Sequence, residues 1–124
     1  MSQYLVFKKG NQELCSFCRS SDVYRSFELP YTENWTELKE DDFNVAISCL
    51  EDRKKGYEED IRLYKKALEG LSYEDKLECL RDIKEANEEL NNIVQALHYI
   101  QLLQIIAEEY DTNNTQQTMY YMIA

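Results

Sequence analysis

The residues suited to metal or redox chemistry are four cysteines and one histidine: Cys15, Cys18, Cys49, Cys79 and His98. Cys15 and Cys18 have the Cys-x-x-Cys spacing that forms half of many zinc sites and the reactive pair of disulfide oxidoreductases. The residues around them read as a strand, however, and a strand directs residues three apart to opposite faces. We therefore expect reduced thiols and no cofactor. A zinc site formed by Cys15, Cys18, Cys49 and His98 is the alternative.

Groups suited to nucleophilic or acid–base catalysis do not form a recognisable pattern. The chain has one histidine and three glycines, and it lacks a GxSxG elbow, a phosphate-binding glycine loop and a dinucleotide fingerprint. A di-iron bundle needs Glu-x-x-His on two helices, whereas Gln95 precedes His98 at that spacing. We expect that the protein is not an enzyme.

Carboxylates are the most abundant reactive groups. The formal net charge is -10, and residues 1–35 carry four charges of each sign, so the whole imbalance lies in 36–124. Five acidic residues repeat at spacings of three and four and would line one helix face over ~21 Å. This acidic stripe is Asp75, Glu78, Asp82, Glu85 and Glu89. It argues against direct nucleic-acid binding and favours a basic protein partner, although a solvated outer face is the simpler interpretation.

Two consecutive helical periodicities would position these groups. The first apolar seam is Phe43, Ile47, Leu50, Lys54, Tyr57, Ile61, Tyr64 and Leu68. The second is Tyr73, Lys76, Leu80, Ile83, Asn87, Leu90, Val94 and Leu97. Between them, Gly70 suits a helix C-cap and Ser72 an N-cap. The pattern predicts a long antiparallel helical hairpin, with helices at about 36–69 and 73–110.

A hairpin that folds at Gly70 and Leu71 pairs residue i with about residue 141 − i. Lys54 then lies level with Asn87, which predicts a polar layer that fixes the register of the helices. The alternative is that both side chains reach solvent. The same rule places Cys49 and Cys79 ~20 Å apart, too far to share a metal or a disulfide.

The second helix has more apolar surface than one partner helix can cover. Four residues flank its seam at seven-residue intervals: Cys79, Ala86, Ile93 and Ile100. A two-helix hairpin is also marginally stable alone. We therefore expect a homodimer, with a four-helix bundle as its form. The expected oligomer or partner interface is Ile93, Ile100, Leu103 and Ile106.

The two ends of the chain have different patterns. Residues 3–29 predict a small three-stranded antiparallel β-meander, with strands at Gln3–Lys8, Glu13–Arg19 and Val23–Leu29. Residues 30–35 would be a connector. For 111–124 we expect a flexible tail, and an added strand is the alternative. The predicted fold is one α+β domain over 1–124, mainly α.

The sequence has neither an apolar run long enough to span a membrane nor the charge and apolar pattern of an export signal. We expect a cytoplasmic protein that does not bind membranes. Its Tyr-, Asn-, Lys- and Glu-rich composition, short length and lack of catalytic motifs look like accessory proteins of phages and large DNA viruses.

We therefore expect a non-catalytic protein-binding module. In its concrete form it is an accessory protein that inhibits or adapts a host protein in the host cytoplasm. One alternative is an acidic nucleic-acid mimic that blocks a basic nucleic-acid-binding protein. Another is a structural or assembly component that forms a helical oligomer.

Overall fold

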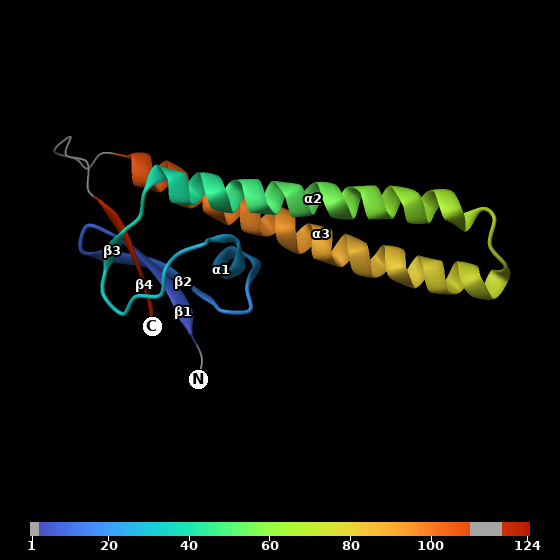
Figure 1. Cartoon of the computed structure of the whole chain (residues 1–124), viewed down its shortest axis with the longest axis horizontal. Coiled ribbons are helices and arrows are strands. Elements are labelled where there is room, and N and C mark those ends of the chain that lie inside the picture. Colours follow the sequence, from blue (N-terminus) through green and yellow to red (C-terminus); the bar gives the residue numbers. More distant parts are fainter. Residues whose placement is uncertain (1–2, 110–117) are drawn as a thin grey trace.

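Two long helices and a small sheet make up the structure, a computed structural model that describes residues 3–109 and 118–124. The elements in chain order are β1 (Tyr4–Lys9), β2 (Gln12–Cys18), α1 (Asp22–Ser26), β3 (Thr36–Glu37), α2 (Glu40–Leu68), α3 (Tyr73–Glu108) and β4 (Met119–Ile123). Figure 1 shows α2 and α3 side by side, with the sheet and α1 at one end of the pair and the other end projecting alone. The predicted α+β, mainly α fold is confirmed.

The helical hairpin begins and ends close to the predicted residues. The Ser72 hydroxyl accepts a hydrogen bond from the Asp75 amide and donates one, 3.0 Å long, to the Asp75 carboxylate, so the N-terminus of α3 is capped as expected. Gly70 does not provide the predicted left-handed C-cap, because the positive-φ glycine of the described chain is Gly10. The Cys79 thiol donates a hydrogen bond to the carbonyl oxygen of Tyr64, 3.4 Å away. The two residue numbers add up to 143, which is close to the 141 that the predicted pairing of the helices requires.

The face that α3 turns toward α2 differs from the predicted one by about one residue. Cys79, Ala86, Ile93 and Ile100, expected beside the seam, are all buried, whereas Leu80 is 50 % exposed and Asn87 is exposed. Both candidate seams share Ile83, Leu90 and Leu97, so periodicity alone does not separate them. Cys79 and Ala86 have small side chains that fit between two adjacent helices, which favours the observed rotation.

The sheet has the strand order β2-β1-β4-β3, and all neighbouring strands are antiparallel. The first two predicted strands are confirmed, with Gly10 at a φ of 60° in the turn between them. The third predicted strand, Val23–Leu29, is wrong: α1 forms there instead. Ser21 caps α1 by accepting a bond from the Tyr24 amide, and Val23 and Phe27, four residues apart, are both buried.

Strand β4 takes the place in the sheet that the missing third strand would have filled. It lies between β1 and β3, with Tyr121 opposite Phe7, so the expected flexible tail is wrong for residues 119–123. The rest of that predicted tail, 111–117, lies outside the described residues. Met119, Tyr121 and Ile123 are buried at alternate positions, and the Tyr121 hydroxyl donates to the carbonyl oxygen of Pro30 at 3.0 Å.

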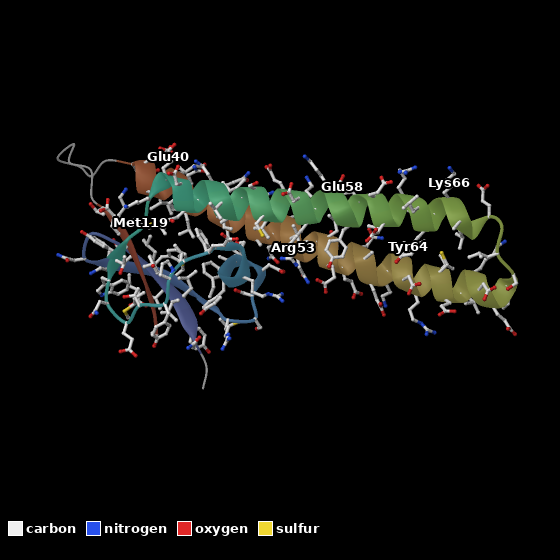
Figure 2. The ribbon with its side chains drawn as sticks, in the orientation of Figure 1. Glu40, Arg53, Glu58, Tyr64, Lys66 and Met119 are labelled. Atoms are coloured by element: carbon white, nitrogen blue, oxygen red, sulfur yellow. The ribbon has the colours of Figure 1, made fainter. Side chains whose placement is uncertain are left out.

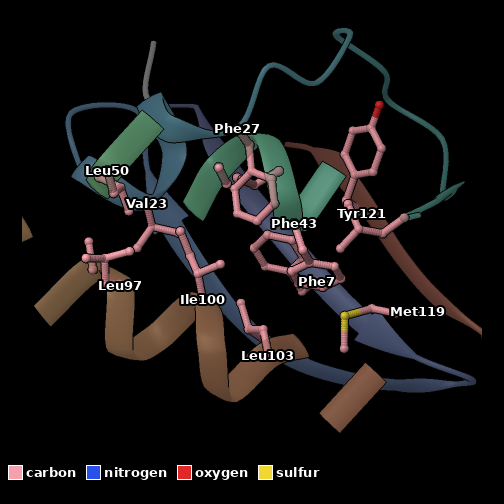
Figure 3. Close-up of a cluster of buried hydrophobic side chains, with 14 of the residues drawn as sticks. Phe7, Val23, Phe27, Phe43, Leu50, Leu97, Ile100, Leu103, Met119 and Tyr121 are labelled. Carbon is pink, nitrogen blue, oxygen red and sulfur yellow. The ribbon is translucent and has the colours of Figure 1, made fainter. Parts of the chain in front are cut away.

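The main core lies between the sheet, α1 and the near halves of α2 and α3 (Figure 3). Phe27 connects the layers, because its ring lies 5.6 Å from that of Phe7 and 6.0 Å from that of Phe43. Asp22 fastens α1 to α2 through an ion pair with Arg53 at 3.1 Å. The sheet and α1 are therefore packed against one end of the hairpin.

Lys9 of β1 connects the sheet to the C-terminal end of α3. Its ammonium group donates hydrogen bonds to the carbonyl oxygens of Ile106 and Glu109, the latter at 2.6 Å. The last turn of α3 contains no basic residue of its own. Lys9 therefore supplies the positive charge and the donors that the last carbonyl groups of a helix require.

Candidate interaction surfaces

The Cys-x-x-Cys pair is split across the sheet, as its place in a strand predicts. Cys15 is half-buried, and burial raises the pKa of its thiol. Cys18 is exposed, and the Ser20 hydroxyl 3.2 Å from its sulfur lowers its pKa. Within the described ranges no three His, Cys, Asp or Glu side chains are grouped to hold a metal, so Cys15, Cys18, Cys49 and His98 are not brought together.

Lys54 and Asn87 do not form the expected register layer. The Lys54 ammonium lies 3.9 Å from the carboxylate of Glu58 on its own helix, and its side chain is 44 % exposed. Asn87 is exposed, and no hydrogen bond joins it to Lys54 in the described part of the chain. The rotation of α3 explains this, because it turns Asn87 away from α2. The solvent-exposed alternative is the one observed.

The apolar residues expected to bind a second copy are covered by the chain itself. Ile93 and Ile100 are fully buried, Leu103 is 4 % exposed, and Ile106 is half-buried. They form the core beneath the sheet and α1. The expectation that these four residues form an open oligomer interface is therefore wrong for the first three, since strands from both ends of the chain occupy that face.

Three of the five residues of the acidic stripe lie beside the groove between the helices. Asp82, Glu85 and Glu89 line a shallow hollow together with Asp60 of α2, and Tyr57 and Tyr64 line it as well. Asp75 is engaged in the cap at Ser72. Across residues 3–109 and 118–124, no Lys or Arg nitrogen lies within 4.0 Å of any carboxylate of the stripe. Its charge is thus open to solvent.

Residues 58–91, named the arm, project beyond the core (Figures 1 and 2). Ile61, Cys79 and Ala86 are the buried hydrophobic residues described there. The arm nevertheless holds five of the eleven large hydrophobic side chains that are exposed in the described chain: Leu63, Tyr64, Tyr73, Leu77 and Leu80. Figure 2 shows side chains crowded around the sheet and α1, whereas those of the arm stand out from two helices alone.

Three of these residues form one patch at the free end of α3. Tyr73, Leu77 and Leu80, named the tip patch, are spaced four and three apart, so they share a helix face. They are 76 %, 49 % and 50 % exposed. Heptad spacing alone places Tyr73 and Leu80 in the seam, so it does not predict this patch. The small residues at Cys79 and Ala86 were the signal that could have revealed it.

Comparisons with known proteins add no assignment: no protein-family model, curated protein or solved structure matches the chain. No helix in the described residues is long and apolar enough to cross a membrane.

Proposed function

We propose that the chain is a non-catalytic protein-binding module whose binding element is the arm. The tip patch is the observation that carries the proposal. Clustered apolar side chains at the end of a projecting element are typical of a protein-binding surface, whereas single exposed leucines are ordinary. A second helix laid along α3 would cover Tyr73, Leu77 and Leu80 together, as in helix-in-groove recognition.

The arm gains stability when it binds. Its own core is thin, so the two helices cover little apolar area beyond Ile61. Covering the exposed half of Leu77 and of Leu80 contributes about 1 kcal/mol for each side chain. Tyr73 adds a larger ring with a polar end, a residue type enriched where interfaces bind most strongly. Such a module acts by occupying or connecting other proteins, as an inhibitor or adapter of a host protein does.

A photo-crosslinking residue placed at Leu77 tests the proposal in the cells that naturally contain the chain. The matched control is the same residue at Val45, which is 42 % exposed but lies on α2 at the sheet end. We expect a defined crosslinked partner from position 77 that Leu80→Glu abolishes and that position 45 does not yield. Equal yields from both positions, or yields unaffected by Leu80→Glu, would refute the arm as the binding element.

A second candidate function is that of an acidic mimic of nucleic acid. It is favoured by the open charge of the stripe, because its five carboxylates, which have no ion pair within residues 3–109 and 118–124, form a strong negative field on one side of the arm. Tyr57 and Tyr64 in the adjoining groove could also contact the cationic side chains of a basic protein. The target would then be a protein whose basic groove binds DNA or RNA.

Release of a fluorescent DNA duplex from the crosslinked partner separates the two candidates. A mimic displaces the duplex, and Glu78→Lys, Asp82→Lys and Glu85→Lys together abolish the displacement. The control reverses three exposed charges elsewhere, Glu51→Lys, Asp52→Lys and Glu69→Lys, with the same change in net charge. If the partner holds the duplex regardless of the chain, the mimic is excluded and the binding module is retained.

A further inference from the structure

The sheet ends on one side in an unpaired strand, β2. Its seven residues extend for about 23 Å. The described chain lays no strand along its outer side, and a row of unpaired amide and carbonyl groups is a template for a further strand. Proline and lysine, which usually protect such edges, are absent from β2. The one irregularity, at Leu14, lies near its start and leaves 15–18 regular.

The hydrogen-bond alternation decides which groups of β2 point outward. Tyr4 exchanges both main-chain bonds with Ala124, and the Arg19 amide donates to Gln3, so the odd-numbered residues of β1 face β2. The main-chain N–H and C=O groups of Cys15 and Phe17 therefore point toward β1, and those of Ser16 and Cys18 point toward the open side of β2. The Cys18 carbonyl already accepts a bond from the Ser21 amide. Ser16 is then the residue that offers both a donor and an acceptor.

An apolar helix face runs beside this strand. Near one end of β2, the Tyr99 ring lies 5.9 Å from the ring of Phe17. Near the other end of β2, the Lys9 ammonium group donates a hydrogen bond to the carbonyl oxygen of Ile106. Tyr99, Leu102 and Ile106, named the α3 row, are spaced three and four apart and share one side of the helix. Tyr99 is 45 % and Leu102 is 56 % exposed, and Ile106 is half-buried.

We propose that the chain forms a homodimer in which β2 pairs antiparallel with β2 of a second copy and the two α3 rows pack together beneath the joined sheets. A two-fold axis at Ser16 lets that residue exchange both main-chain bonds with its counterpart. The Cys18 amide of each copy then lies opposite Leu14 of the other. Both copies gain strand hydrogen bonds and an apolar contact from one continuous surface.

The distribution of charge favours a second copy as the occupant. The edge belongs to residues 1–35, which carry four positive and four negative charges, whereas the arm carries 11 negative and 6 positive charges. Because α3 runs antiparallel to β2 and continues into the arm, the two-fold axis directs the two arms in opposite directions. Two chains of net charge -10 thus meet through residues 12–18 and 99–106, whose one charged side chain is Glu13. A basic partner protein would gain nothing from this neutral edge.

Sedimentation equilibrium of the full chain, from micromolar to submillimolar concentration, tests the dimer. We expect twice the monomer mass in the wild type and in Ser16→Ala, which keeps the amide group. Ser16→Pro removes an outward-facing donor without breaking the β1–β2 ladder, so it should give a monomer. Leu102→Glu should do the same through the α3 row, and circular dichroism checks that each variant is folded.

Crosslinking then tests the register. Paired strand residues that exchange both hydrogen bonds lie about 5.5 Å apart between Cα atoms, a distance that a disulfide spans. Ser16→Cys with Cys18→Ser should oxidise to a covalent dimer, whereas Ser48→Cys in the same background, on the exposed side of α2, should not. A monomeric wild type, or a dimer that survives either Ser16→Pro or Leu102→Glu, overturns the proposal.

Discussion

Replacing Lys9 with methionine should destabilise the protein through the C-terminal end of α3. The substitution keeps most of the aliphatic stem and removes the ammonium group that donates to the Ile106 and Glu109 carbonyls. A hydrogen bond to a charged group contributes ~1.5–3 kcal/mol where it is buried. The charge–dipole interaction adds ~0.3–1 kcal/mol. Because Lys9 is half-exposed and water can replace part of both bonds, we expect a total loss of about 2 kcal/mol.

Urea unfolding followed by circular dichroism measures this loss. Lys84→Met is the matched control, since Lys84 is exposed in the middle of α3 and has no ion pair in the described chain. It should change the free energy of unfolding by less than about 0.5 kcal/mol. Equal effects of the two substitutions would show that Lys9 does not hold the helix end, and the explanation of how β1 fixes α3 would fail.

Three further predictions follow from burial and local contacts. Iodoacetamide should modify Cys18 first, because it is exposed and the Ser20 hydroxyl lowers its pKa, and buried Cys79 last; peptide mass spectrometry gives the order, and equal rates would contradict it. Burial raises the pKa of Tyr121 in the folded protein. The free energy of unfolding should therefore stay constant below about pH 10, which is the pKa of a tyrosine in the unfolded chain, and should fall as the pH rises above that value. Thermal melts should show that Tyr121→Phe removes this alkaline loss; an unchanged profile would exclude Tyr121 as its source. Ile93→Ala should cost about 3 kcal/mol in urea unfolding, against less than about 1 kcal/mol for exposed Ile105→Ala, and similar costs would place Ile93 outside the core.

The sequence predicts the hairpin well because its signals are local and repeated. The cap formed by Ser72 and Asp75 determines where α3 begins. The long apolar periodicities on both sides of it indicate that α3 packs antiparallel to α2. The rotation of α3 depends on smaller differences, since neighbouring heptad positions are apolar over much of the helix. Ala86 and Cys79 favour the observed rotation because their small side chains are buried between the helices, whereas a hydrophobic pattern does not record side-chain size.

The sheet is harder to predict because its pairing is not local. Strand β4 pairs with β1 across more than one hundred residues of chain, and its five residues alone resemble an apolar tail end. At α1, the Ser21 cap and the i, i+4 pair of Val23 and Phe27 outweigh the alternation typical of a strand. The acidic stripe was found from sequence, but its position beside Tyr57 and Tyr64 required the structure.

The claim on which the functional proposal depends is that α3 buries Ala86 and leaves Leu80 open to a partner. Urea unfolding of Leu80→Glu and Ala86→Glu tests it directly. We predict a loss below about 1 kcal/mol for Leu80→Glu and above about 2 kcal/mol for Ala86→Glu, which forces a charge between the helices. If Leu80→Glu is the more damaging substitution, α3 faces α2 with its other side, and the tip patch does not exist.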